Sequence, residues 1–288
     1  MVFSMSLTNW RKRSPVQIRI SKGMEVDLAE AIAPGVWWLH RTRGCNVFLA
    51  ETASHGLILF DTGFSSSLPG ILEEVEALRP GARITHLFLT HHHADHAGTA
   101  AVLRGHYGAL VVAGAADCRQ DDRGRFLLRT QIGTSHRRRR ILRRFLASGG
   151  PATEVVVDRP LSGEGEIAGI LAIPTPGHTL GSYCYLLSDR DVAIVGDLVI
   201  SHRTGLVRPM KAANHDDEQY LHTLSMFASR APNIGCPGHG AVVSGGFQGQ
   251  LTALASLQRR SLISPAGAWT RGRRMWQFAR GMTRERRP

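Results

Sequence analysis

Histidines and an aspartate crowd six consecutive positions between His91 and His96, in the stretch His-His-His-Ala-Asp-His. An apolar run at 84–89 leads into this cluster, and a helix-like segment follows it. In an extended backbone successive side chains point to opposite faces, so His91, His93 and Asp95 can face one way while His92 faces the other. His96 then lies where the chain turns into a helix. We therefore expect one short loop to supply ligands to two adjacent metal positions.

Further residues of the ligand type stand far away in the sequence, each at the end of an apolar stretch and beside glycine. His178 follows Pro-Thr-Pro-Gly, Asp197 follows Val-Ala-Ile-Val-Gly, and His239 lies in Cys-Pro-Gly-His-Gly. Asp61 closes the apolar run Leu-Ile-Leu-Phe. Glycine lets backbones approach closely, and residues in loops at strand ends can converge on one site. Alone each is a common loop residue, but together with the cluster they indicate a shared centre.

The elements that must position these residues follow from the alternation of apolar runs and turn signals. Strands are expected at 35–39, 46–50, 56–60, 84–89, 109–113, 154–157, 169–173, 182–187, 192–195 and 234–236. Helices are expected at 67–78, 97–104, 216–229 and 247–262, and residues 115–148 are predicted to form an inserted, basic helical hairpin. The strands arrive in two blocks with helices after each block, which favours two packed sheets with helices outside.

The motif Thr90–His96 resembles the T-H-x-H-x-D-H signature of the metallo-β-lactamase-fold superfamily, and four further residues match its other motifs in order over about residues 30–245. The resemblance implies an α/β (α+β) fold, a four-layer αβ/βα sandwich of two packed mixed β-sheets with the site along one edge. It also implies how the ligands divide. The first metal would be held by His91, His93 and His178, the second by Asp95, His96 and His239, and both by Asp197, with Asp61 orienting a ligand.

Nitrogen-rich ligands with a shared carboxylate favour two zinc ions, with iron or manganese as alternatives. Such a pair can clamp a water and lower its pKa. The sequence is similar to the glyoxalase II-like and lactonase-like branches, which implies a binuclear metal-dependent hydrolase that uses a metal-bound hydroxide to cleave a thioester, lactone or related ester. Asp95 and Asp61 are the expected catalytic residues. The candidate substrate or proton-donor contacts are His202, Tyr183 and Tyr185.

Two other activities stay open. Persulfide dioxygenases resemble the same scaffold with a single iron held by two histidines and an aspartate, and metal content would separate that alternative. RNA or phosphodiester hydrolysis is suggested by the arginine-rich hairpin and tail. The short span from Asp197 to His239 leaves no room for the large inserted domain of the nuclease branch that resembles this core.

The net charge of +12 resides at the two ends of the chain. Residues 1–23 carry five basic and no acidic residues, and residues 258–288 carry nine arginines against one glutamate. We predict an N-terminal extension at 1–23, a catalytic domain at 24–262 and a basic tail at 263–288, with nucleic acid as a less favoured partner of that tail. The absence of a long apolar run and of a signal-like start predicts a cytoplasmic enzyme with a small-molecule substrate and no membrane partner.

Overall fold

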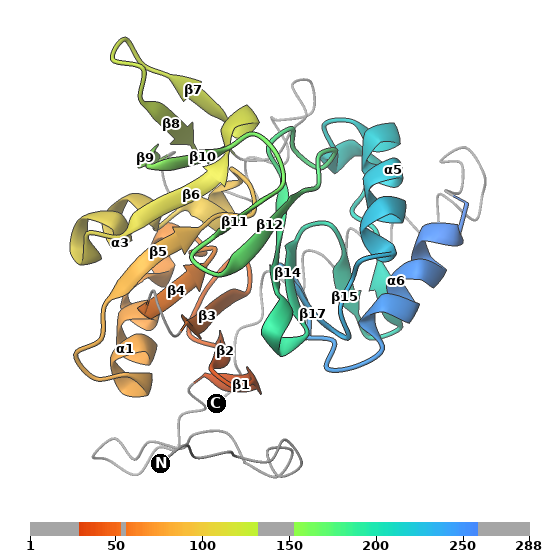
Figure 1. Ribbon diagram of the computed structural model, residues 1–288, viewed down its shortest axis with the longest axis horizontal. Coiled ribbons are helices and arrows are strands. Elements are labelled where there is room, and N and C mark those ends of the chain that lie inside the picture. Colours follow the sequence, from red (N-terminus) through yellow and green to blue (C-terminus); the bar gives the residue numbers. More distant parts are fainter. Residues whose placement is uncertain (1–28, 53–55, 132–152, 259–288) are drawn as a thin grey trace.

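Two β-sheets packed face to face form the centre of the computed structural model, which describes residues 29–52, 56–131 and 153–258 (Figure 1). The first sheet has the order β1-β2-β3-β4-β5-β6-β10, and its strands are Glu30–Ala33, Val36–Leu39, Val47–Thr52, Gly56–Phe60, Ile84–Phe88, Leu110–Gly114 and Arg159–Leu161. The second has the order β11-β12-β13-β14-β17, and its strands are Gly165–Ile167, Ile170–Pro174, Tyr183–Leu187, Val192–Gly196 and Ile234–Pro237. Both sheets mix parallel and antiparallel pairs.

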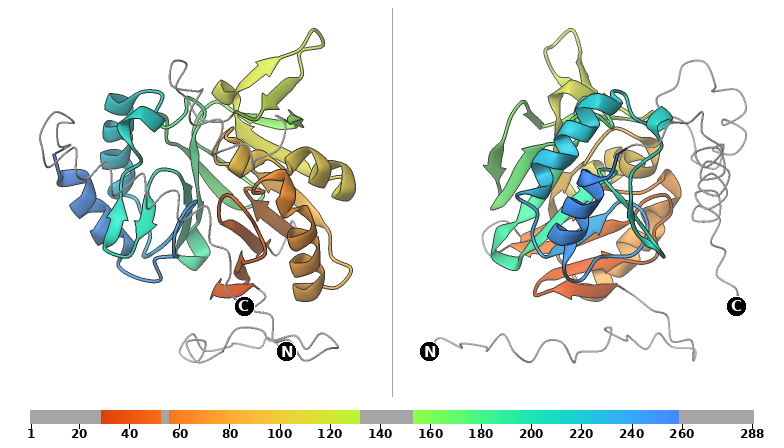
Figure 2. Two further views of the ribbon diagram at one scale, coloured as in Figure 1. Left: turned by 180° about the vertical axis from the view of Figure 1, so that it is seen from behind. Right: turned by 90° about the vertical axis from the view of Figure 1, so that its right-hand side faces the viewer.

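Helices cover the outer face of each sheet (Figure 1, Figure 2). On the first sheet, α1 (Leu68–Leu78) and α3 (Ala100–Tyr107) pack into a shared apolar layer with the strands. On the second, α5 (Asp217–Ala228) and α6 (Phe247–Ser256) do the same. The predicted αβ/βα sandwich is confirmed.

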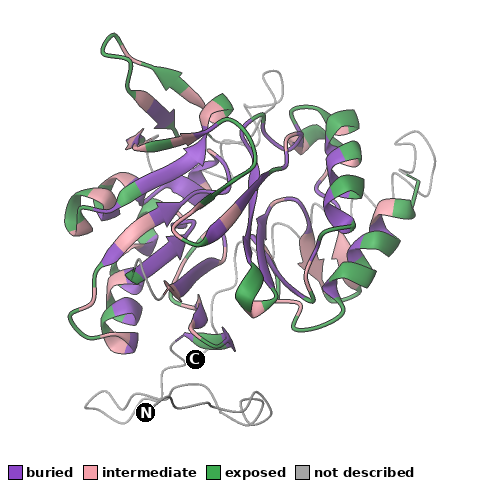
Figure 3. Cartoon of the chain, in the orientation of Figure 1, coloured by how far each residue is buried: buried purple, intermediate pink, exposed green. Residues whose placement is uncertain are grey.

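The layer between the sheets is rich in aromatic side chains and is buried along its length (Figure 3). Phe60 and Phe88 of the first sheet contact Tyr185 of the second, with ring centroids 5.8 and 5.1 Å apart. Aromatic pairs of this kind bury large apolar areas in a defined geometry, so they hold the two sheets in one relative position.

The segment at 118–129 is extended, which contradicts the prediction of a helical hairpin over 115–148. β7 (Cys118–Gln120), β8 (Phe126–Arg129) and β9 (Glu154–Val157) form a small antiparallel sheet that projects from the sandwich (Figure 1). Asp121 closes the hairpin because its Oδ1 accepts the backbone N–H groups of Arg123 and Arg125. The remainder of the predicted hairpin, with Arg137 to Arg140, lies outside the described residues.

The other short elements sit around the sandwich: β15 (Ile200–His202) pairs with β16 (Gly205–Val207), and the helical turns are η2 (Ser65–Ser67), α2 (Ala94–Ala97), η3 (Ala115–Asp117), η5 (Ser188–Arg190) and η6 (Lys211–Ala213). α6 ends at Ser256, six positions before its predicted end, because Leu257 takes an extended conformation at ψ 132°. The predicted extension at 1–23 and tail at 263–288 lie outside the described ranges. Among residues 29–52, 56–131 and 153–258, no helix has the length and hydrophobicity required to cross a bilayer.

The predicted site residues follow five strands, β4, β5, β12, β14 and β17, whose carboxyl ends meet at one edge of the sandwich. β4 and β5 run parallel in the first sheet, and β14 and β17 run parallel in the second. Asp61 follows β4 directly and Asp197 follows β14 directly. Loops at the ends of parallel strands converge, and this edge therefore collects residues that are far apart in sequence.

Hydrogen bonds across the sheets fix the loops at this edge. The Tyr185 hydroxyl of β13 donates to the Leu89 carbonyl at 2.6 Å, and the Tyr183 N–H donates to the Thr90 carbonyl at 2.9 Å. The Asn46 side-chain amide donates to the carbonyls of Pro237 and Gly240, on either side of His239. The loop of one sheet is thus positioned by groups of the other.

Gly114, the last residue of β6, tests how tightly these loops must fit. A Cβ atom there would lie 2.1 Å from the carbonyl oxygen of Gly181, in the loop that follows His178. We expect Gly114→Ala to lower the free energy of unfolding by about 1–3 kcal/mol, since two backbones must separate. Gly105→Ala in α3, where nothing lies within 4 Å of the added Cβ, is the control and should stabilise by up to about 1 kcal/mol. Urea unfolding measures both, and a Gly114→Ala protein as stable as the wild type would contradict the close approach.

Candidate metal centre

The histidine cluster begins at His91, three residues after the end of β5, and enters a helix at Ala94. His93 is extended at φ −66° and ψ 148° and stands directly before α2. The predicted alternation therefore holds for His91, His92 and His93 but fails at Asp95, which belongs to a helical turn. This change of backbone turns Asp95 and His96 toward a different set of partners from those of His91 and His93.

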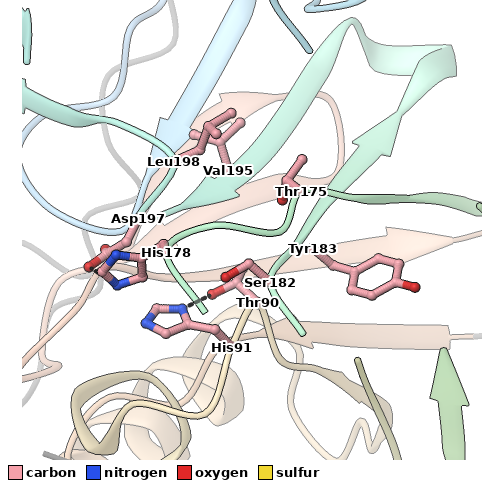
Figure 4. Close-up of a pocket in the computed structure, with 9 residues that line it drawn as sticks. All are labelled: Thr90, His91, Thr175, His178, Ser182, Tyr183, Val195, Asp197 and Leu198. Carbon is pink, nitrogen blue, oxygen red and sulfur yellow. Dashed lines mark hydrogen bonds and ion pairs between the residues drawn. The ribbon is translucent and has the colours of Figure 1, made fainter. Parts of the chain in front are cut away.

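The first group of ligand atoms combines His91 and His93 of the cluster with His178, which follows β12, and Asp197, which follows β14. His91 Nε2 lies 2.9 Å from His93 Nδ1, and His178 Nε2 lies 3.2 Å from the same His93 nitrogen. Asp197 Oδ2 lies 3.4 Å from His178 Nε2. Figure 4 shows His91, His178 and Asp197 meeting from three different segments. These four side chains can offer one ligand atom each to a single ion.

A second group adjoins the first and is built from Asp95, His96 and His239. His239 Nε2 lies 3.4 Å from Asp95 Oδ2, and His96 Nε2 lies 4.0 Å from the same oxygen. Asp197 Oδ1 completes this group, at 3.3 Å from both His96 Nε2 and His239 Nε2. Asp197 thus directs one carboxylate oxygen at each group.

The donor atoms of both groups fit metal ions. His96 Nε2 and Asp197 Oδ1 are buried and form no hydrogen bond among the described residues, although they face each other. Buried polar atoms are rarely left without a partner unless they bind an ion or a water. Three imidazole nitrogens that converge on one point, with a carboxylate oxygen beside them, are ligands that divalent transition metals prefer.

The surroundings favour the metal-binding protonation states of His91, His93 and Asp197, whereas His96 and His239 of the second group have raised pKa values and hold a proton that a bound metal must displace. Burial lowers the pKa of His93 to about 3 and that of His91 well below its usual value. Burial alone would raise the pKa of Asp197, but the positive charge available on His239, His96 and His178 outweighs it and lowers that pKa. For His239 burial is outweighed by Asp197 and Asp95, which raise its pKa. Neutral imidazoles and ionised carboxylates are the forms that bind metal.

Asp61 lies behind the second group and holds His96 in place. Its Oδ2 accepts hydrogen bonds from His96 Nδ1 and from the Thr90 hydroxyl, both at 2.8 Å. Its Oδ1 accepts a hydrogen bond from the Thr90 backbone N–H, also at 2.8 Å. An ionised carboxylate only accepts hydrogen bonds, so His96 donates from Nδ1, and Nε2 is the nitrogen that a metal would bind on displacing its proton. Asp61 adopts φ 55°, a conformation that costs a residue with a side chain free energy and is retained at functional sites.

Cys45, Asp61 and His96 also lie within reach of one ion, but they do not make a convincing metal site. Burial raises the pKa of the Cys45 thiol to about 11, so the sulfur stays protonated and is a poor ligand. Asp61 and His96 Nδ1 already bind each other. The two groups that share Asp197 are therefore the candidate centre.

Asp117, in η3, is a residue of this site that sequence analysis missed. Its buried carboxylate accepts the N–H of His92, the hydroxyl of Thr179 and the N–H of Gly181, at 3.1, 2.8 and 2.8 Å. His92 Nδ1 lies 3.0 Å from the same carboxylate, which accounts for His92 lying outside both groups. One side chain thus joins the loop of His91 and His93 to the loop of His178. No sequence motif marks it.

The three predicted proton donors are placed differently from expectation. Tyr185 is fully buried and its hydroxyl donates to Leu89, while the Tyr183 hydroxyl donates to Gly163 and its ring points away from His91 and Asp197 (Figure 4). In this structure both tyrosine hydroxyls are engaged by backbone carbonyls, and their role toward a substrate stays a prediction. His202, in β15, lies with Nδ1 3.1 Å from the Thr204 hydroxyl and belongs to neither ligand group.

The comparison with known families agrees with this geometry. Residues 40–239 match the family model described as the metallo-beta-lactamase superfamily, which covers more than half of the chain. The chain belongs to the metallo-β-lactamase superfamily. Its family and its buried His–Asp groups place it among the metal-dependent hydrolases of that superfamily.

Curated relatives are about a quarter identical to the chain over the residues that align. The uncharacterised protein YobT of Bacillus subtilis is 28% identical over 68% of this chain and 82% of its own length. An atrochrysone carboxyl ACP thioesterase of Aspergillus fumigatus is 27% identical over 76% of the chain and 58% of its own length. A hydroxyacylglutathione hydrolase of Rhizobium etli is 26% identical over 59% and 57%. The chain thus spans less than two thirds of the two relatives whose activity is named.

Solved structures support the fold. A metallo-β-lactamase from Cronobacter sakazakii, mutated in its HARLDQ motif, superposes with a TM-score of 0.55 at 23% identity over 90% of this chain and 99% of its own. An archaeal superfamily protein from Sulfolobus tokodaii gives a TM-score of 0.57 at 16% identity over 87% and 99%.

Asp117→Asn tests whether this carboxylate joins the two ligand loops. An amide replaces one acceptor oxygen by a donor, which leaves a buried N–H or hydroxyl without its partner and should cost about 1–3 kcal/mol of unfolding free energy. Asp122→Asn, an exposed carboxylate at the tip of the β7–β8 hairpin, is the matched control and should change stability by less than about 0.5 kcal/mol. Chemical denaturation compares them, and equal stabilities for the two variants would refute the role.

Proposed function

We propose that the chain is a binuclear metal-dependent hydrolase that cleaves thioesters. The observation that carries the proposal is the carboxylate of Asp197, whose Oδ2 faces His178 and whose Oδ1 faces His96 and His239. The first metal would be held by His91, His93 and His178, the second by Asp95, His96 and His239. Zinc suits this set, with iron or manganese as alternatives.

Two divalent ions bound there would polarise the carbonyl of the substrate and acidify a water molecule. The side chains supply the remaining functions. Asp197 fixes the separation of the two ligand groups, and Asp61 holds His96 with Nε2 directed at the second group. Asp95 is 21% exposed, against 12% for Asp197, so of these two carboxylates it is the more accessible to a substrate or water.

The choice of a thioester rests on the leaving group. Tyr183 and Tyr185 donate their hydroxyls to backbone carbonyls of the interior and are not placed to protonate a departing atom. A thiol has a pKa near 8.5, so it departs as a thiolate without a proton donor, whereas an amine cannot. With neither tyrosine as a proton donor, we propose thioesters rather than amides as the substrate class.

The relatives point the same way. One is named as a thioesterase for a substrate carried on an acyl carrier protein, and another as a hydrolase of hydroxyacylglutathione, which is itself a thioester. What they have in common is an acyl group linked to a thiol, and we propose this bond as the substrate class without choosing between a small thiol and a carrier.

Asp197→Ala should remove both metals rather than one, because a carboxylate oxygen is lost from each group. Elemental analysis of the purified full-length protein would then fall from about two zinc ions per chain toward none. His92→Ala is the control, since His92 belongs to the same cluster but to neither ligand group. An Asp197→Ala protein that retained a full complement of metal would show that this residue does not bridge.

Substrate preference is tested by giving the zinc-loaded enzyme matched thioester, oxoester and amide substrates with one acyl group. Thiol release should exceed oxoester cleavage by at least about tenfold, with no amide cleavage, since only the thiolate departs unaided. A preparation with one iron per chain that consumed oxygen and released no thiol would contradict the proposal in favour of a dioxygenase.

A further inference from the structure

The His178 side chain is hydrogen-bonded to Asn214, a residue that belongs to no sequence motif. Its Nδ1 lies 3.0 Å from Oδ1 of Asn214, a buried residue just before α5. The Asn214 side-chain amide Nδ2 in turn donates to Asp217 Oδ1 at 2.8 Å. Histidine, asparagine and aspartate thus form a chain that leads away from the first ligand group.

The direction of this chain follows from the chemistry of its last member. An ionised carboxylate only accepts hydrogen bonds, so Asp217 must face the NH2 group of Asn214. The Asn214 carbonyl oxygen is then turned toward His178, and His178 must donate from Nδ1. Its Nε2 is left without a proton and free to bind a metal. Asp217 therefore sets the tautomer of a histidine that it does not touch.

The backbone around these residues supports the same role. The N–H groups of His215 and Asp216 donate to the carbonyls of His178 and Gly177, both at 3.0 Å. The start of α5 also packs so closely on Gly177 that a Cβ there would lie 2.4 Å from the Tyr220 Cα. The segment at 214–217 thus holds the His178 loop through backbone and side chain together.

We infer that Asn214 and Asp217 are positioning residues that fix the tautomer and orientation of His178, and so set the metal affinity of the first ligand group. This rests on the proposed function, in which His178 is a ligand. The device has a counterpart at His96, where Asp61 supplies the acceptor directly. The two groups differ because His178 meets a neutral amide and His96 meets a charged carboxylate.

The test titrates zinc into the full-length protein against a competing chelator. Asn214→Ala should weaken zinc binding at one of the two sites by about 10–100-fold and leave the other affinity unchanged. A loss of this size is expected when the hydrogen-bond partner of a ligand histidine is removed. In the wild type, nitrogen NMR of the imidazole should find the proton of His178 on Nδ1, and in Asn214→Ala a mixture of tautomers. A residue that only stabilises the fold would lower the melting temperature without changing the tautomer.

Two further variants separate positioning from packing. The exchange of Asn214→Asp with Asp217→Asn reverses the outer hydrogen bond but keeps an acceptor toward His178, and it should restore zinc affinity at least to the wild-type level. Asp216→Asn, which alters the side chain that caps α5 without touching the His178–Asn214–Asp217 chain, should leave both affinities unchanged.

The outcomes distinguish this inference from the proposed function. A wild-type chain that binds fewer than two zinc ions overturns both. A wild-type chain that binds two, with an Asn214→Ala variant of unchanged affinity and tautomer, overturns the inference alone. Loss of affinity in Asp216→Asn equal to that in Asn214→Ala also overturns it, because the effect would then belong to the helix.

Discussion

A single carboxylate, that of Asp197, is the interaction on which the rest of the site depends. It lies among three histidines from different segments and directs an oxygen at each of two ligand groups. A buried carboxylate is costly unless positive charge compensates it, and here that charge comes from imidazoles and, when present, from metal. Because Asp197 ends a strand of the second sheet while His96 follows a strand of the first, the site exists only where the two sheets meet.

Contacts between the two sheets fix the position of the edge at which the site lies. Aromatic rings between the sheets fix their relative position, and the hydroxyl of Tyr185 reaches across to the carbonyl of Leu89, next to the histidine cluster. Three acidic or amide side chains then act behind the ligands: Asp61 on His96, Asn214 on His178, and Asp117 on the backbone of the loop that carries His91 and His93. Each ligand loop is therefore held from behind by a polar residue that is not itself a ligand, which is how metal sites are preorganised.

The sequence predicted the sandwich and the side chains that converge at its edge, for a physical reason. Metal binding demands histidine and aspartate whatever the fold, so His91, His178 and Asp197 could be recognised by type and by their place at strand ends. Asp117 and Asn214 could not, because an ordinary acid or amide has a role only through the loop that folding brings against it. Residues 118–129 were misjudged since a short apolar run such as Phe126-Leu127-Leu128 suits a strand as well as a helix.

The central claim is that two metals share Asp197. It is tested most directly by anomalous diffraction at the zinc edge from crystals of the zinc-loaded protein. The account predicts two peaks per chain, one among His91, His93 and His178 and the other among Asp95, His96 and His239, with an Asp197 oxygen next to each. A single peak, or two peaks of which only one lies beside Asp197, would contradict it.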